Sequence, residues 1–252
     1  MIDYGQFCTV ARGAEIIGQR WTPLVVRELL CGSTRFNDIH RGVPRMSRSL
    51  LAERLRMLEE VGVVRRTTAA GSVREYHLTQ AGEELRPIIM ALGHWGARWS
   101  GSRLQRDQLD AGFLMWDIRR FMKVDECPRD RCIVIHFRLT DAHAGERLWW
   151  LVATGGEVDL CREDPGREVT LIVEATVRGL TEVWTGDRQP SDATQAHAVR
   201  VVGAQRDRAA LSRWLGRSVF AETREQRPRR RRRTIARRPV AMVGARGAPT
   251  QQ

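Results

Sequence analysis

The run SRSLLAERLRMLEEVGVVRRTTAAGSVREYHL, residues 47–78, decides the fold of the first part of the chain. Its first half places leucines at helical spacing behind Ser47, which can cap a helix, and Gly62 can end that helix near Val61. Its second half has two β-prone runs, 63–68 and 73–78, separated by four small residues. The stretch therefore predicts a helix followed directly by a β-hairpin.

The residues on either side predict further helices. Residues 8–31 have apolar side chains at an approximate 3.6-residue period and are expected to form one or two helices, with Pro23 in the first turn of the second. A short helix is expected to begin at 35–39 and to stop before the segment Gly42-Val43-Pro44. After the hairpin, Thr79 can cap a long helix that Pro87 is expected to kink. This order predicts a winged helix-turn-helix.

The helix after Ser47 has an apolar arc and an opposite polar arc that contains Ser49, Ala52, Glu53 and Arg56. In a helix-turn-helix the exposed face of the second helix reads base edges in the major groove. We therefore expect DNA contacts from Arg45, Ser47, Arg48, Ser49 and Arg56.

Three arginines of the hairpin, Arg65, Arg66 and Arg74, are placed to reach phosphates or a neighbouring minor groove. The alternative is that they are ordinary solvated strand charges. Arg54 projects from the apolar arc, so we expect an internal ion pair with Glu28 or Glu59 rather than a DNA contact.

The formal net charge of +12 is unevenly distributed: residues 1–106 carry +6, residues 107–226 carry −3 and residues 227–252 carry +9. Only the outer pieces favour a polyanion. The last piece is rich in arginine and proline and has few large apolar residues, so a disordered tail is expected. It would either add sequence-independent affinity for DNA or act as a flexible solubilising end.

The composition changes near Ala111. An amphipathic helix to Met122 precedes strand-like runs at 132–139, 147–153, 158–161, 169–174 and 199–202, and a final helix is expected at 208–215. The fold class is therefore predicted as α+β, with a winged helix-turn-helix domain at 1–106, an α+β domain at 107–226 and the tail at 227–252.

The first domain resembles the HxlR family of transcription regulators over roughly residues 5–100. The resemblance rests on Cys8, Ser47 and the segments IGQRWT (17–22), LVVREL (24–29), RFNDI (35–39), LLAERL (50–55), LEEVGVV (58–64), YHLTQAG (76–82) and ALGHW (91–95). It implies double-stranded DNA as a partner and a homodimer joined through the first and last helices of the domain. Cys8 stands where some members have a cysteine similar to a thiol sensor, although Thr9 departs from the usual proline. The alternative for Cys8 is a small buried residue at the dimer contact.

The second domain resembles the sterol-carrier-protein-2-like fold through GEVDLC (156–161), DPG (164–166), LTEVWTGD (180–187) and WLG (214–216). That fold implies an apolar cavity between sheet and helices and hence a hydrophobic or lipid-like effector. The tryptophans that could line the cavity, or alternatively form plain core, are Trp116, Trp149, Trp150, Trp184 and Trp214.

Several function classes have no support in the sequence. It contains no phosphate loop, nucleophile elbow or zinc pattern, so we expect no enzyme activity, no cofactor and no metal. It has no long apolar run and no signal peptide, and its five cysteines are scattered. These features predict a soluble cytoplasmic protein, associated with the nucleoid when bound to DNA, with no membrane partner.

Three hypotheses remain. The main one is a dimeric, sequence-specific regulator modulated by a hydrophobic ligand in the second domain. The second is an architectural protein that binds DNA without sequence preference. The third is a carrier of hydrophobic ligands that retains a helix-turn-helix.

Overall fold

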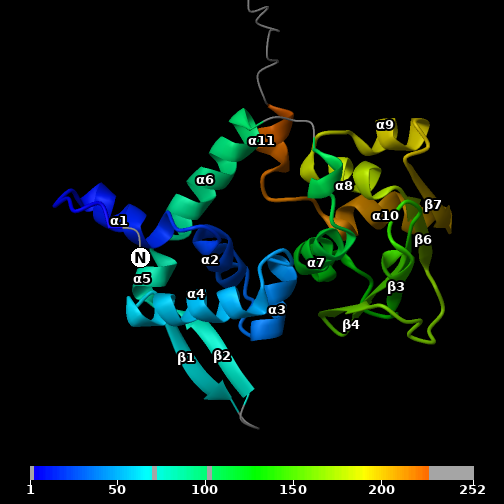
Figure 1. Ribbon diagram of the computed structural model, residues 1–252. Helices are drawn as coiled ribbons and strands as arrows, with labels where there is room; N and C mark the ends of the chain where they lie inside the picture. The colour runs from blue at the N-terminus through cyan, green and yellow to red at the C-terminus, as the bar shows by residue number, and fades with distance from the viewer. Residues whose placement is uncertain (1–2, 70–72, 101–103, 227–252) are drawn as a thin grey trace, which may run out of the picture.

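The structure is a computed structural model that describes residues 3–69, 73–100 and 104–226. These residues form a head (described residues up to 100) and a C-terminal unit (104–226), each with its own hydrophobic core. The two units lie side by side (Figure 1). The predicted basic tail, 227–252, and the hairpin tip, 70–72, lie outside the described residues.

The head is a winged helix-turn-helix. Its elements are α1 (Thr9–Ile17), α2 (Thr22–Leu30), α3 (Phe36–Gly42), α4 (Arg48–Glu60), β1 (Val64–Ala69), β2 (Val73–Leu78), α5 (Gln80–Glu83) and α6 (Arg86–Trp99). Helices α3 and α4 form the helix-turn-helix, and the antiparallel strands β1 and β2 form the wing, which projects beyond α4 (Figure 1).

Local signals define α4. The Leu50 amide donates to Ser47 Oγ at 3.3 Å, which confirms Ser47 as the cap. After the helix ends, Gly62 takes a φ of +75°, a left-handed conformation that costs glycine little. Leu51, Leu55 and Leu58 are buried in the head's core, so α4 presents its other face outward.

The single kinked helix predicted after Thr79 is wrong. Thr79 instead caps the short α5 by accepting from the Gly82 amide at 3.2 Å, and a separate helix, α6, starts at Arg86. Pro87 therefore lies in the first turn of α6, where its missing N–H leaves no helical hydrogen bond unmade.

The C-terminal unit contains helices and a mixed sheet. Its elements are α7 (Ala111–Phe121), β3 (Ile133–Leu139), β4 (Leu148–Thr154), β5 (Glu157–Cys161), β6 (Leu171–Ala175), α8 (Val177–Thr185), α9 (Pro190–Gln195), β7 (Val199–Gly203), α10 (Gln205–Leu215) and α11 (Ala221–Glu225), with short 3-10 turns at Arg106–Gln108, Val124–Glu126 and Ala144–Glu146. The strand order is β5-β4-β3-β6-β7, in which only the β3–β6 pair is parallel. Helices α7, α8 and α10 contribute to the core on one face of this sheet.

The sequence patterns predicted these five strands to within two residues at each end, but they did not predict α8, α9 or α11. Thr176 caps α8 by accepting from the Gly179 amide at 2.9 Å, and Gly186 ends it with a φ of +80°. Both signals are readable in the sequence. The resemblance of this unit to the sterol-carrier fold stays a prediction.

Candidate nucleic-acid interface

The outward face of α4 carries the predicted polar residues. Ser49, Ala52, Glu53 and Arg56 are exposed, and Ser49 Oγ lies 3.2 Å from Ser47 Oγ at the start of the helix. Arg56 Nε is 3.8 Å from Glu60 Oε1, but both side chains are largely exposed, so this pair contributes little and can be exchanged for another partner.

Arg48 and Arg45 flank the start of α4. Arg48 donates from Nη2 to Asn37 Oδ1 at 2.6 Å and lies over the Phe36 ring, with its guanidinium carbon 5.1 Å from the ring centroid. These contacts hold Arg48 between the two helices of the motif. Arg45 is exposed and, among the described residues, has neither an ion pair nor a side-chain hydrogen bond.

The wing is tied to the rest of the head at its base. The Tyr76 amide donates to the Thr34 carbonyl at 2.8 Å, and Arg35 Nε lies 3.6 Å from Glu75 Oε1. These contacts orient the wing relative to α3.

The strand register distributes the wing's arginines over both of its faces. Arg66 pairs with Tyr76 and Thr68 with Arg74, so Arg66 and Arg74 share one face and Arg65 lies on the other. All three are exposed; Arg66 Nε is 3.6 Å from Glu59 Oε1. Arg65 and Arg74 have no ion-pair partner within the described part of the chain.

Arg54 is internal, but its predicted partner is wrong. It donates to Gln19 Oε1 rather than pairing with Glu28 or Glu59, and Gln19 in turn donates from Nε2 to the Glu15 carbonyl at 2.9 Å. Arg54 thus joins α4 to the segment between α1 and α2, away from the exposed face.

Glu28 is fully buried and forms ion pairs with Arg27 of the head and Arg120 of α7. Arg120 Nη1 donates to Glu28 Oε1 at 3.2 Å and Nη2 donates to Oε2, which makes the contact bidentate. Burial by itself lowers the Arg120 pKa, but the Glu28 carboxylate more than offsets this and the pKa is raised. Sequence reasoning missed this link because the two residues meet only when the units dock.

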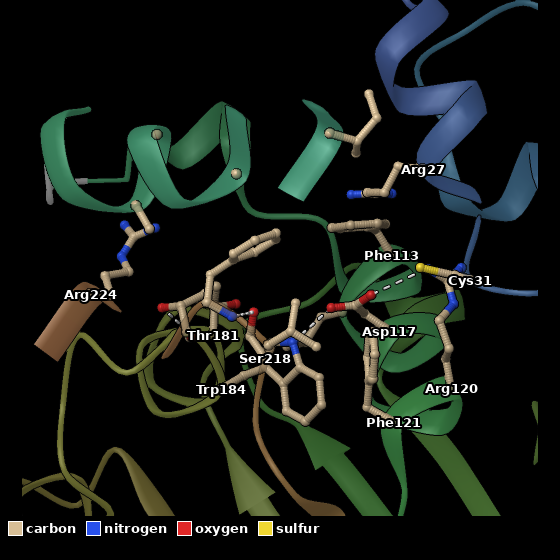
Figure 2. A pocket seen from close by; sticks show the side chains of 18 of the residues that line it. Arg27, Cys31, Phe113, Asp117, Arg120, Phe121, Thr181, Trp184, Ser218 and Arg224 are labelled. Carbon is tan, nitrogen blue, oxygen red and sulfur yellow. Dashed lines mark hydrogen bonds and ion pairs between the residues drawn. The ribbon is translucent and has the colours of Figure 1, made fainter. Parts of the chain in front are cut away.

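A cavity of about 600 Å³ lies between the head and the C-terminal unit (Figure 2). Helices α2 and α6 wall it on one side, and α7, α8 and the segment leading into α11 wall it on the other. Trp184 donates from Nε1 to Asp117 Oδ2 at 2.8 Å in this cavity. Burial raises the pKa of Asp117, although the Trp184 hydrogen bond and Arg120 oppose the shift. Burial also raises the pKa of the nearby Cys31 thiol.

A second cavity of about 970 Å³ lies within the C-terminal unit, between strands β6 and β7 and helices α8 and α10. Of the five tryptophans predicted to line a ligand cavity, only Trp184 lines either of the two. Trp149 and Trp214 belong to the core. Trp150 stacks on His136 with centroids 4.5 Å apart, and Trp116 is covered by arginines.

Cys8, the predicted thiol sensor, is exposed at the N-terminal end of α1. Within the described residues, no group of three His, Cys, Asp or Glu side chains is placed to hold a metal ion. The same part of the chain contains no helix with the length and apolar character needed to cross a membrane.

Comparison with known proteins identifies the head. The profile of the HxlR-like helix-turn-helix family matches residues 16–103. The helix-turn-helix-type transcriptional regulator YvaP of Bacillus subtilis is 40% identical over 90 residues, which are 35% of this chain and 83% of that protein. The chain belongs to the HxlR family. It is accordingly a DNA-binding transcription regulator, and its relatives are named as regulators rather than as enzymes.

Further matches to regulators cover a similar share of this chain. The regulator Rv3095 of Mycobacterium tuberculosis is 41% identical over 92 residues, which are 35% of this chain and only 56% of that protein. Among solved structures, the redox regulator HypR in its reduced form is 31% identical to this chain, with a TM-score of 0.33. The match covers 35% of this chain and 90% of the HypR chain. Reduced YodB of B. subtilis is 27% identical and covers 39% of this chain and 100% of its own, with a TM-score of 0.34.

Proposed function

We propose that this HxlR-family regulator binds a specific DNA sequence as a homodimer and that a hydrophobic small molecule bound through its C-terminal unit modulates the affinity. The observation that carries the DNA-binding proposal is the exposed polar face of α4 next to a wing with arginines on both faces. Ser49 and Arg56 lie near the centre of that face and are assigned to base and phosphate contacts.

The remaining predicted contacts are assigned to phosphates. Arg45, Arg65 and Arg74 are exposed and have no ion-pair partner among the described residues, so binding a phosphate breaks no existing pair. Arg66 would exchange Glu59 for a phosphate, and Arg48 and Ser47 would contact the backbone at the start of α4.

The homodimer proposal is supported by an exposed apolar stripe on α6. Ile88, Leu92, Trp95 and Trp99 follow helical spacing and are between 47% and 62% exposed. Val10 of α1 is more exposed still. The family resemblance implies that the first and last helices of the head join the protomers, and these helices carry the stripe. A second copy of the chain would remove it from water.

DNA titrations at matched salt test sequence specificity. The full-length protein and a version ending at Gln226 are each titrated with DNA from the protein's own promoter and with scrambled DNA. We expect promoter preference of about a thousandfold or more, retained without the tail. The double variant Ser49→Ala with Arg56→Ala should lose at least about tenfold of that preference, whereas Arg138→Ala, an exposed arginine of β3, should not. Equal binding to both DNAs, lost with the tail, would instead support the architectural hypothesis.

Sedimentation measures the oligomeric state. The full-length protein should sediment at twice the chain mass, and Trp95→Asp should yield monomers with weakened promoter binding. The matched variant Val202→Asp replaces an exposed apolar residue of β7 and should stay dimeric. A monomeric unmodified protein would contradict the dimer proposal.

A further inference from the structure

Helix α6 separates two environments. Its stripe of Ile88, Leu92, Trp95 and Trp99 faces away from the C-terminal unit, and its other side lines the 600 Å³ cavity with Ile89, Met90, Gly93, Gly96 and Ala97. In Figure 1, α6 reaches from the head to α11 of the C-terminal unit. A single helix therefore stands between the cavity and the face assigned to the second protomer.

Close packing attaches the far end of α6 to the C-terminal unit. A Cβ at residue 93 would lie 2.2 Å from Phe220 Cζ, so any larger residue there would force the Phe220 ring to move. His94 Nδ1 lies 2.7 Å from Thr223 Oγ1, and the His94 ring meets the Phe220 ring edge to face with centroids 5.2 Å apart. A displacement at the cavity is thus carried to α6 through direct contacts.

The cavity has the size and lining of a small-molecule site. About 600 Å³ lies within the range of ligand pockets, which are mostly apolar with a few placed polar groups. Four aromatic rings line it: Phe113 and Phe121 of α7 and Trp184 of α8 (Figure 2), and Phe220 just before α11. The lining is therefore suited to flat aromatic molecules.

The arginines that line the cavity are already paired with carboxylates. Arg120 is bidentate to Glu28, and Arg224 donates from Nε to Asp187 at 2.7 Å. An anion would have to compete with these carboxylates, which disfavours anionic ligands. Asp117 accepts from Trp184 Nε1 through Oδ2 at 2.8 Å, and its Oδ1 lies 3.5 Å from Arg120 Nη1. A carboxylate has about four acceptor sites, so Asp117 can accept a further hydrogen bond from a neutral donor.

We propose that this cavity is the effector site, that it takes an uncharged aromatic molecule with one hydrogen-bond donor directed at Asp117, and that the effector acts through α6 on the dimer contact. The inference rests on the proposed function and places its ligand between the units rather than in the second cavity. The Arg-rich segment after Gln226 is a poor occupant, because the cavity is largely apolar and its arginines would repel that segment.

The location of the cavity couples ligand binding to DNA binding. Since the walls belong to both units, a ligand that fills the cavity stabilises one relative position of α6 and α7, and it shifts the protein towards the dimer geometry with that position. The spacing of the two α4 helices then changes, and with it the affinity for promoter DNA. By linkage, promoter DNA changes the ligand affinity by the same factor.

N-phenyl-1-naphthylamine is a suitable probe because it is uncharged, aromatic, carries one N–H donor and fluoresces in apolar sites. Gly96 of α6 is the position for blocking the cavity, because a Cβ built there has no atom within 4 Å and the backbone is unstrained. Gly96→Leu should weaken probe binding by the full-length protein at least tenfold, and the matched Gly96→Ala should retain it. Ser212→Leu, which narrows the second cavity instead, should also retain it.

The regulatory half is tested on the same proteins. The probe should change promoter affinity at least about fivefold in the unmodified protein and in Gly96→Ala, and not in Gly96→Leu. Probe binding that survives Gly96→Leu, binding lost in Ser212→Leu alone, or bound probe that leaves promoter affinity unchanged would each overturn the inference. A failure of the proposed function can be distinguished from a failure of this inference. If the proposed function is wrong, the protein binds promoter and scrambled DNA with equal affinity even when no probe is present.

Discussion

Replacing Arg120 with methionine should destabilise the protein by about 2–4 kcal/mol. Arg120 is only 8% exposed and Glu28 is fully buried, so the substitution leaves a buried carboxylate without its bidentate partner. Removal of one member of a buried pair typically costs about 3–5 kcal/mol. Our value is lower because Arg27 Nε still donates to Glu28 Oε1 at 3.1 Å and methionine retains apolar volume beside Trp116.

Urea unfolding at fixed protein concentration, followed by tryptophan fluorescence, measures this loss. The matched control is Arg138→Met, which removes an exposed pair with Glu174 and should cost at most about 1 kcal/mol. Combining Arg120→Met with Glu28→Gln should cost less than the sum of the two single changes, since the second removes the unpaired charge. A loss for Arg120→Met no larger than that of the control would refute the reasoning that this pair joins the two units.

Three further outcomes are expected. In Gly42→Ala the new Cβ would lie 1.8 Å from Glu28 Cδ, so either the Glu28 carboxylate must leave its ion pairs or α2 and α3 must separate, and the free energy of unfolding should fall by about 1–3 kcal/mol; an unchanged melting temperature would contradict this. Burial raises the Asp117 pKa, so this group favours the folded state only at low pH and the contribution is lost as pH rises through the folded-state pKa. Asp117→Asn, which can still accept from Trp184, should therefore raise the melting temperature at pH 7 more than at pH 4, and a larger gain at pH 4 would exclude the explanation. Arg74→Ala should weaken binding to promoter and scrambled DNA alike and reduce the slope of log affinity against log salt by about 1, whereas a loss confined to promoter DNA would indicate base readout instead.

The sequence alone was sufficient for α4, where the signals are local and agree with one another. Ser47 directly precedes α4, and its side chain is a good helix cap. Gly62 follows the helix and readily adopts a left-handed backbone conformation. These two residues located the ends of the helix. The periodicity of the leucines within α4 identified its exposed face, because residues on one helix are related by a fixed angle per residue. The strands of the C-terminal unit followed from their β-prone composition.

Tertiary structure decided every contact between distant segments. Glu28 and Arg120 are 92 positions apart, and no periodicity relates them; their pairing exists because α7 docks against α2. Arg54 donates to Gln19, which is 35 positions away, whereas Glu28 pairs with Arg27 and Arg120. Trp184 lines the cavity between the head and the C-terminal unit, whereas the other four predicted tryptophans do not. This too depends on how the two units, each with its own core, pack against each other, and side-chain chemistry alone does not determine that packing.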